Sequence, residues 1–306
     1  MSLLVRRSNL LVPISDAGAV ANAWRHNADA ITLDLTANAN ANAGARDAIK
    51  AAITSAAKGS AEVFLRVNKA SLQADLEASV WPGLCGIMLP QVESAAEVSQ
   101  AADIMATLEQ QRGIKAGALQ LILMLESAPG VWDIRPILNA SPRVTQAALD
   151  ERALAAELGF TPLPELDPFD YARGRLAVEA TAAKVAAVGM AYPLSVNPRE
   201  LPDADLHELA TKAKNLGMKG VICPHPFSSW VAPVNAAFTP TPELVEWNRR
   251  VREAFAVGVA AGTAAVPLDG KMIDVPVDEW AIVVLAMAEA CAARDAQKQR
   301  AARSRC

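Results

Sequence analysis

The chain has 306 residues, with 29 Lys and Arg against 33 Asp and Glu, and a formal net charge of −4 at pH 7. This length suits one α/β barrel of roughly 250 residues with an extension, or two ordinary domains. The near-neutral, slightly acidic charge balance excludes a nucleic-acid-binding protein, which would carry a basic stripe.

The compartment is indicated by the cysteines and by the lack of targeting signals. The cysteine spacings fit neither a metal site nor a redox motif. The first residues lack the apolar stretch of a secretory signal, and no window of about 18 apolar residues is free of charge, so no membrane partner is expected. We therefore expect a soluble cytoplasmic protein with reduced thiols. The cysteines are Cys85, Cys223, Cys291 and Cys306.

Short apolar runs recur along the chain and predict eight strands. Most are rich in Val, Ile and Leu with little polar alternation, which is typical of strands covered on both faces. The runs are Leu10–Ile14, Ala30–Leu35, Val63–Asn68, Gly86–Pro90, Leu119–Glu126, Arg143–Leu149, Ala191–Val196 and Gly220–Pro224.

Helical segments separate these runs. The predicted helices are a segment capped by Asp16 and reaching about Arg25, then Gly44–Lys58, Glu93–Gln110, Phe169–Val188 and Asp203–Leu216. Strands that alternate with helices indicate an α/β fold. Eight such strands favour a (β/α)8 TIM barrel over residues 1–240. A doubly wound open sheet is the alternative.

Residues 241–306 do not fit a ninth strand–helix unit, and predict a helical extension. Thr241–Val259 has the period of an amphipathic helix, and Asp269 with the following glycine marks a turn. Val277–Ala293 is apolar nearly all round, so we expect the extension to pack on a neighbouring subunit. The basic tail Arg294–Cys306 is expected to fray.

Charged residues end several of the predicted strands, where the functional groups of a barrel gather. Arg66 is suited to bind a carboxylate or phosphate, or else closes the barrel mouth by pairing with Asp34 or Glu126. Glu126 is either a ligand for a hard metal or the partner of Arg66. His225, between two prolines, is a candidate base or a structural residue, and Asp34 requires an ion-pair or hydrogen-bond partner because it lies inside an apolar strand.

Motifs along nearly the whole chain carry a family resemblance. They are Arg7-Ser8, Ile31–Leu35, Arg66-Val67-Asn68, Ile87–Pro90, Glu126 with Gly130, Ala172-Arg173, His225-Pro226, Asn235, and Asp269–Asp274. The last run, DGKMID, is the most specific. Together these motifs resemble the citrate lyase β-subunit-like branch of the HpcH/HpaI aldolase superfamily.

The resemblance implies a carbon–carbon lyase on a TIM barrel that assembles as a homotrimer or hexamer. Such enzymes cleave or form a bond in a carboxylated 3-hydroxy acid or its CoA thioester, and some are thioesterases. A Mg²⁺ ion holds the substrate oxygens and stabilises the enolate.

The resemblance also implies roles for individual residues. Arg66 would hold a carboxylate, with Asp34 and Gln91 as further substrate-binding positions. Glu126 would bind the metal. Asp274 would enter a neighbouring subunit's site as an acid–base group, with His225 as a second catalytic candidate.

The chain departs from the family pattern at polar positions expected around the pocket. Ala153 stands where the second metal ligand, an Asp, is expected, and Arg152 replaces the Glu before it. The other departures are Thr36 and Ala37 for Glu-Asp, and Gln91, Val221 and Asn42 for lysines.

These departures leave two functions open. In one, the protein is a lyase in which Asp150 or Glu151 supplies a shifted carboxylate, or in which Arg152 replaces the metal as the fixed positive charge. In the other, it is a non-catalytic or functionally diverged member, a ligand-binding protein or structural partner, that has lost Mg²⁺-dependent lyase activity.

Overall fold

The structure is a computed structural model that describes residues 4–36, 42–160, 168–189 and 201–304. It divides into two compact units, the larger one Arg6–Phe238 and the smaller one mainly Thr239–Arg303. Each unit is described by itself. Within the described residues, no helix combines the length and apolar character that a membrane span requires.

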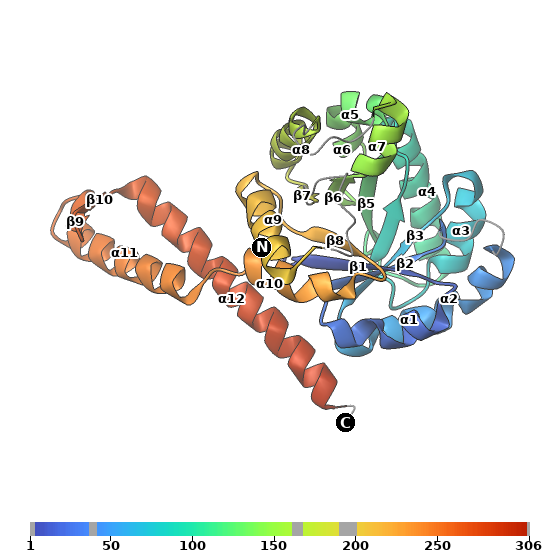
Figure 1. Ribbon diagram of the computed structural model, residues 1–306, viewed down its shortest axis with the longest axis horizontal. Helices are drawn as coiled ribbons and strands as arrows, with labels where there is room; N and C mark the ends of the chain where they lie inside the picture. The colour runs from blue at the N-terminus through green and yellow to red at the C-terminus, as the bar shows by residue number, and fades with distance from the viewer. Residues whose placement is uncertain (1–3, 37–41, 161–167, 190–200, 305–306) are drawn as a thin grey trace. The chain divides into compact units, whose positions relative to one another are not determined.

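The larger unit is built on one parallel sheet, which in the described part of the chain has eight strands (Figure 1). The sheet order is β7-β6-β5-β4-β3-β2-β1-β8. The strands are β1 Ser8–Pro13, β2 Ala30–Asp34, β3 Glu62–Arg66, β4 Gly86–Leu89, β5 Gln120–Leu125, β6 Val144–Leu149, β7 Ala186–Val188 and β8 Val221–Pro224.

Backbone hydrogen bonds bring the two edges of this sheet together. Lys219 N donates to Ala187 O at 2.7 Å, and Gly189 N donates to Gly220 O at 3.0 Å. The result is a nearly closed barrel, so the predicted (β/α)8 fold is confirmed and the open doubly wound sheet is wrong.

Helices lie around the outside of the strands (Figure 1). Asp16 caps the first of them as predicted, because its side chain accepts a hydrogen bond from Ala19 N. The α-helices are α1 Ala17–Asn22, α2 Asn42–Ala56, α3 Leu72–Ser79, α4 Ala95–Gln111, α5 Ala128–Trp132, α6 Ile134–Leu138, α7 Glu151–Leu158, α8 Asp170–Ala183, α9 Asp203–Asn215 and α10 Val231–Phe238. Short 3₁₀ turns are η1 Ala23–His26, η3 Ala57–Gly59, η4 Lys69–Ser71 and η6 Ser228–Trp230.

The seventh strand begins earlier than the sequence indicates. The predicted helix Phe169–Val188 is too long, because α8 ends at Ala183 and Lys184 turns the chain with a φ of 59°. The Ala-rich composition continues past this turn, so helical propensity alone does not mark the end. The next residues, Ala186–Val188, form β7. The predicted strand Ala191–Val196 lies outside the described residues.

Alternate residues of each strand face opposite sides of the sheet. This alternation determines which side chains face the barrel interior. One set packs between the strands and the helices, as Leu33 and Leu65 do. The other set fills the barrel interior with a smaller apolar cluster. Its fully buried members are Ala30, Phe64, Met88, Ile122, Met124, Ala148 and Val188. The residues two positions further along these strands therefore face the interior at its carboxyl end.

The smaller unit is a pair of helices joined by a β-hairpin. Its elements are α11 Pro242–Ala260, β9 Val266–Leu268, β10 Lys271–Ile273 and α12 Val275–Arg303. The predicted turn at Asp269 is confirmed, with positive φ at Asp269 and Gly270. The expected frayed tail is wrong, because α12 extends to Arg303, supported by local pairs such as Asp295 with Lys298.

Candidate active site

Four charged residues gather at the carboxyl end of the barrel, and the strand period explains why. Asp34 and Arg66 end β2 and β3, two residues beyond Thr32 and Phe64 on the interior face. Glu126 and Asp150 directly follow β5 and β6. Active sites of (β/α)8 proteins lie at this end, so the four residues mark the candidate site.

Arg66 lies at the centre of this charged cluster. Its Nη2 donates to Glu126 Oε1 at 2.9 Å, and its Nη1 lies 3.7 Å from Asp34 Oδ2. Asp34 in turn accepts hydrogen bonds from the Thr36 backbone N and hydroxyl. Arg66 Nε is buried without a hydrogen-bond partner in the described part of the chain. Arg66 thus has the expected carboxylate partners and retains one donor for a ligand.

Burial raises the pKa of the Glu126 carboxyl, which is only 9% exposed. The Arg66 guanidinium opposes this rise, whereas the negative charge of Asp150 adds to it. The backbone N–H of Gln91 also donates to Glu126 and favours its charged form. Two neighbouring carboxylates therefore share a site that favours a proton or a cation.

Gln91, expected as a substrate-binding position, contributes to the site through its backbone. It has a φ of 52°, in the left-handed region. Its carbonyl accepts a hydrogen bond from Lys69 Nζ at 2.7 Å, and the same ammonium pairs with Glu97. Lys69 thus places a positive charge beside Gln91, where the family pattern has a lysine. The sequence gives no spacing signal for this contact, which joins two different loops.

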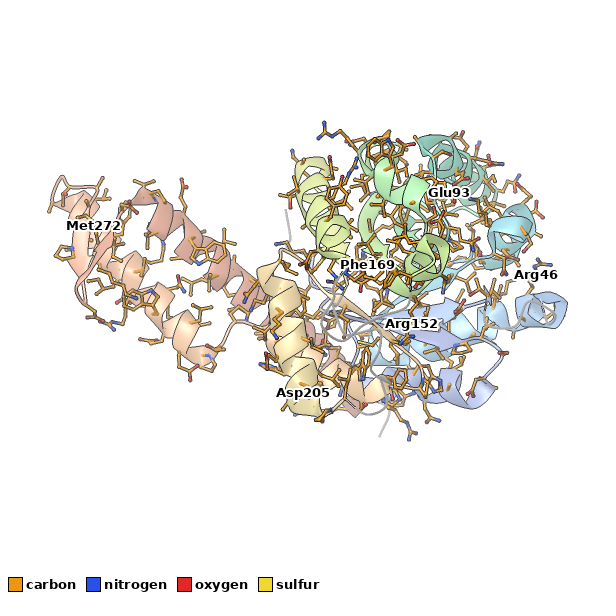
Figure 2. The ribbon with its side chains drawn as sticks, turned by 45° about the horizontal axis from the view of Figure 1, so that its top comes forward. Arg46, Glu93, Arg152, Phe169, Asp205 and Met272 are labelled. Carbon is orange, nitrogen blue, oxygen red and sulfur yellow. The ribbon has the colours of Figure 1, made fainter. Side chains whose placement is uncertain are left out.

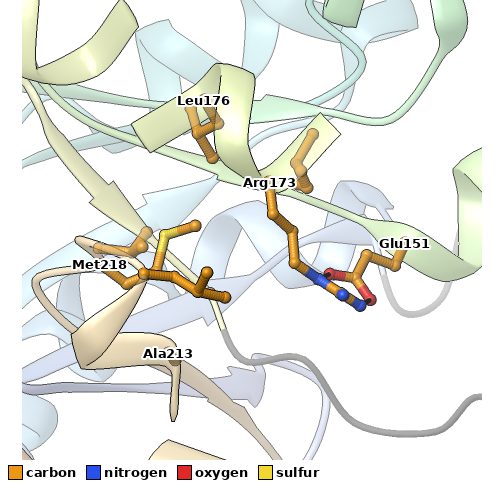
Figure 3. A pocket seen from close by; sticks show the side chains of 9 residues that line it. Glu151, Arg173, Leu176, Ala213 and Met218 are labelled. Atoms are coloured by element: carbon orange, nitrogen blue, oxygen red, sulfur yellow. Dashed lines mark hydrogen bonds and ion pairs between the residues drawn. The ribbon is translucent and has the colours of Figure 1, made fainter. Parts of the chain in front are cut away.

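Two acidic residues follow β6, and their hydrogen bonds show which of them can still bind a metal ion or ligand. Asp150 caps α7, and its Oδ1 accepts hydrogen bonds from Arg152 N and Ala153 N, each at 3.1 Å. Both carboxylate oxygens of Glu151 bind Arg173, at 2.6 Å each. Figure 3 shows the Arg173 guanidinium facing this carboxylate. Glu151 is therefore committed to a buried ion pair, and Ala153 offers no ligand atom.

A cavity of about 500 Å³ opens over these residues. Arg66, Asp150, Glu151 and Arg152 form its charged side, and Arg152 is labelled in Figure 2. Its apolar side comprises Leu11, Met88, Met124, Ile222, Pro224, Phe227 and Trp230. The last two rings stack with centroids 5.3 Å apart. This volume fits a small organic ligand with one charged and one apolar end.

The donor set fits a magnesium ion. The described residues hold no group of three or more His, Cys, Asp and Glu side chains that could bind a metal. Mg²⁺, however, usually takes only one or two protein carboxylates and completes its shell with water and substrate oxygens. Glu126 and Asp150 supply two carboxylates at the ends of adjacent strands, which meets this requirement.

The remaining predicted residues lie elsewhere. The backbone N–H of His225 donates a hydrogen bond to Leu11 O. The pKa of His26 is lowered, first by burial and second by electrostatic repulsion from His225. Asp274 belongs to the smaller unit, where its Oδ1 accepts a hydrogen bond from Val277 N at the start of α12. Their catalytic roles stay predictions.

One expected departure does not concern the pocket. Val221 is the first residue of β8 and pairs with Ser8, so it lies at the amino end of the barrel and not around the cavity. The prediction was wrong because the position of a residue within its strand, not its nearness to His225 in sequence, decides which end it occupies. Ala37 lies outside the described residues, as does the side chain of Asn42.

Comparison with known proteins shows the family to which the chain belongs. The model of the HpcH/HpaI aldolase/citrate lyase family matches residues 7–226, and the chain belongs to this family. The chain is 31% identical over 281 residues to a citrate lyase subunit beta-like protein of Deinococcus radiodurans, covering 88% of this chain and 93% of the relative. It is 28% identical over 295 residues to citrate lyase subunit beta of Escherichia coli K12, covering 95% of each.

Solved structures share the fold. The CitE protein of Mycobacterium tuberculosis, in complex with magnesium, acetoacetate and coenzyme A, matches with a TM-score of 0.70 and 23% identity over 93% of this chain and 98% of that one. A citrate lyase from Burkholderia xenovorans LB400 matches with a TM-score of 0.77 and 13% identity over 95% and 93%.

Proposed function

We propose that this protein is a carbon–carbon lyase acting on a carboxylated 3-hydroxy acid or its CoA thioester. The observation that carries the proposal is Arg66, which lines the cavity together with Asp150, binds Glu126 through Nη2 and has a buried Nε without a hydrogen-bond partner among the described residues. An arginine donor left without an acceptor at the carboxyl end of a barrel suits a substrate carboxylate. Relatives that include a citramalyl-CoA lyase of Homo sapiens, 27% identical over 288 residues, support the reaction class.

In this proposal the residues in and around the cavity have different roles. Arg66 binds and orients the substrate carboxylate, while Glu126 accepts a hydrogen bond from Arg66 Nη2 and holds the guanidinium in place. Glu126 is also the first ligand of Mg²⁺, which when bound polarises the substrate carbonyl and stabilises the developing enolate. The apolar wall of Phe227 and Trp230 excludes water from the substrate.

The acid–base group is proposed to come from the smaller unit of a neighbouring subunit. Asp274 is held at the start of α12 by its bond to Val277 N. The exposed side chains Trp280, Ile282 and Val283 on the same helix support burial against another copy of the chain. We accordingly propose a homotrimer or hexamer, with His225 as the second candidate for proton transfer.

A turnover assay tests the function directly. Malyl-CoA, citramalyl-CoA and citryl-CoA are each incubated with the protein and Mg²⁺ or Mn²⁺, and the release of acetyl-CoA, pyruvate or oxaloacetate is followed. We expect cleavage of at least one thioester. The Arg66→Met variant should lose at least about 100-fold in kcat/KM, as when a charge-stabilising donor is removed. The matched control is Arg135→Met, which removes an exposed arginine.

Absence of turnover with all three thioesters and with the free acids malate, citramalate and citrate, at high enzyme concentration, would contradict the lyase and favour the second candidate, a non-catalytic ligand-binding member. The observation that favours the non-catalytic candidate is Ala153. At this position, where the family resemblance implies the second metal ligand, the side chain has no oxygen. Calorimetric binding of a thioester without any cleavage is the result expected of that candidate.

A further inference from the structure

Ala153 stands where the family resemblance implies an acidic metal ligand. Ala153 is the third residue of α7, which is separated from β6 by the single residue Asp150. A side chain at this third position projects from the first turn, next to the residue that caps the helix. The capping residue is therefore the nearest place from which a lost carboxylate can be replaced.

In this chain the capping residue is itself acidic. Asp150 Oδ1 accepts the N–H groups of Arg152 and Ala153, so its carboxylate lies against the turn that carries position 153. These bonds use one oxygen of the group and fix its orientation. Asp150 also lines the cavity.

Strand register places Asp150 beside Glu126. Leu149 of β6 pairs with Leu125 of β5, so the two acidic residues are the next ones along adjacent parallel strands. Asp150 N donates to Leu125 O at 2.9 Å, which continues the ladder to this point. Adjacent strands lie about 4.8 Å apart, a separation that lets two side chains on the same face share one ion.

The neighbouring acidic residue does not compete for this role. Both oxygens of Glu151 bind Arg173, whose side chain is 5% exposed, and breaking this pair would leave a buried charge without its partner. Arg152 lines the same cavity and opposes a cation there. The alternative to a shifted ligand is therefore a metal-free site in which Arg152 supplies the positive charge.

We propose that Asp150 replaces the missing ligand at position 153 and, together with Glu126, holds the divalent cation in this protein. The metal ligand has moved from the third residue of the helix to its cap. The inference rests on the proposed function for the use of the ion, but binding of the ion does not depend on turnover. It can therefore be tested alone.

Titration of the full chain with Mn²⁺, followed by electron paramagnetic resonance of the free ion, measures the site without a substrate. We expect the wild type to bind one Mn²⁺ per chain. The Asp150→Asn variant should bind at least about tenfold more weakly, because it loses the charge. Asn caps helices as well as Asp does, so α7 should be retained.

A rescue variant and a matched control separate ligand loss from damage to the fold. Adding Ala153→Asp to Asp150→Asn returns a carboxylate to the same turn and should recover most of the affinity. Asp16→Asn makes the same change at the cap of α1, where the side chain accepts from Ala19 N, and should leave Mn²⁺ binding unchanged.

Three results would overturn the inference. They are a wild type that binds no Mn²⁺, an Asp150→Asn variant that binds as tightly as the wild type, and a double variant that recovers nothing. Binding that depends on Asp150 in a protein that cleaves none of the thioesters or free acids would refute the proposed lyase and leave the metal site standing.

Discussion

Two arginines at opposite ends of the barrel have opposite surroundings. Arg6 precedes β1 at the amino end, with a side chain only 1% exposed, and all three of its guanidinium nitrogens donate hydrogen bonds. The guanidinium also lies over the ring of Phe64, 4.7 Å from its centroid. Its acceptors stand at the starts of three strands: Glu62, Gln120, Thr145 and Gln146.

Arg66 at the carboxyl end is bound less completely. It has one close carboxylate, a second at 3.7 Å, and an Nε that donates to no described group. An arginine with all of its donors used holds strand ends together, whereas one with a spare donor beside a cavity is prepared for a ligand. We therefore expect the amino end to contribute stability and the carboxyl end to bind a ligand.

The largest expected effect is on the free energy of unfolding, when Arg6 at the amino end of the barrel is replaced. Arg6→Met leaves Glu62 without its ion-pair partner and removes the hydrogen bonds that Arg6 donates to Gln120 and the buried Gln146, so the free energy of unfolding should fall by about 3 kcal/mol or more. Urea denaturation measures the loss. The same change at Arg135, which is 74% exposed and also pairs with a glutamate, should have little effect on the free energy of unfolding. Equal losses at the two positions would contradict a structural role for Arg6.

The next largest expected effect is on catalysis, when Arg66 at the carboxyl end of the barrel is replaced. Arg66→Lys keeps the positive charge but removes the planar fork and the spare Nε donor. We expect kcat/KM for the cleaved thioester to fall about 100-fold, with the free energy of unfolding changed by less than about 1 kcal/mol. Steady-state kinetics and urea denaturation of one preparation test both parts. A variant with full activity would assign Arg66 to structure alone.

The smallest effect is a pH dependence of stability that comes from Glu126. Its pKa is raised in the folded state, mainly by burial, so ionisation costs the folded state more than the unfolded one. The contribution of Glu126 to the free energy of unfolding therefore falls as the pH rises from its unfolded pKa, about 4.3, through its folded pKa.

Glu126→Gln cannot ionise and sharpens this prediction. The free energy of unfolding of the variant minus that of the wild type should increase over the same pH range and then level off. Denaturation curves at several pH values measure this slope, which is separate from any constant offset caused by the lost bond to Arg66. A difference that decreases with pH would contradict the raised pKa.

Much of the barrel and its charged end could be predicted from the sequence. The apolar runs located seven of the strands, because a strand buried on both faces must be apolar throughout. A count in steps of two from Phe64 reaches Arg66, and from Met124 it reaches Glu126, so both fall on the interior face. The same count from Ala148 reaches Asp150, which alignment with the family pattern had left as one of two alternatives.

Other features depend on contacts that no local pattern encodes. The bond between Glu151 and Arg173 joins the start of α7 to α8, and only the fold shows that it removes Glu151 from the site. The turn at Lys184 uses a non-glycine residue at positive φ, so the usual glycine signal for a helix end is missing. Phe227 and Trp230 read as ordinary aromatic residues until the fold places them on the cavity wall.

The pairing of β1 with both β2 and β8 has a consequence for the synthesis of the protein. Ser8 and Val221 are register partners, so the last strand cannot be added until most of the chain has left the ribosome. Until then, β1 presents an unpaired row of backbone N–H and C=O groups to any other nascent chain. A chain terminated before β8 would keep that edge permanently open and would be prone to aggregate.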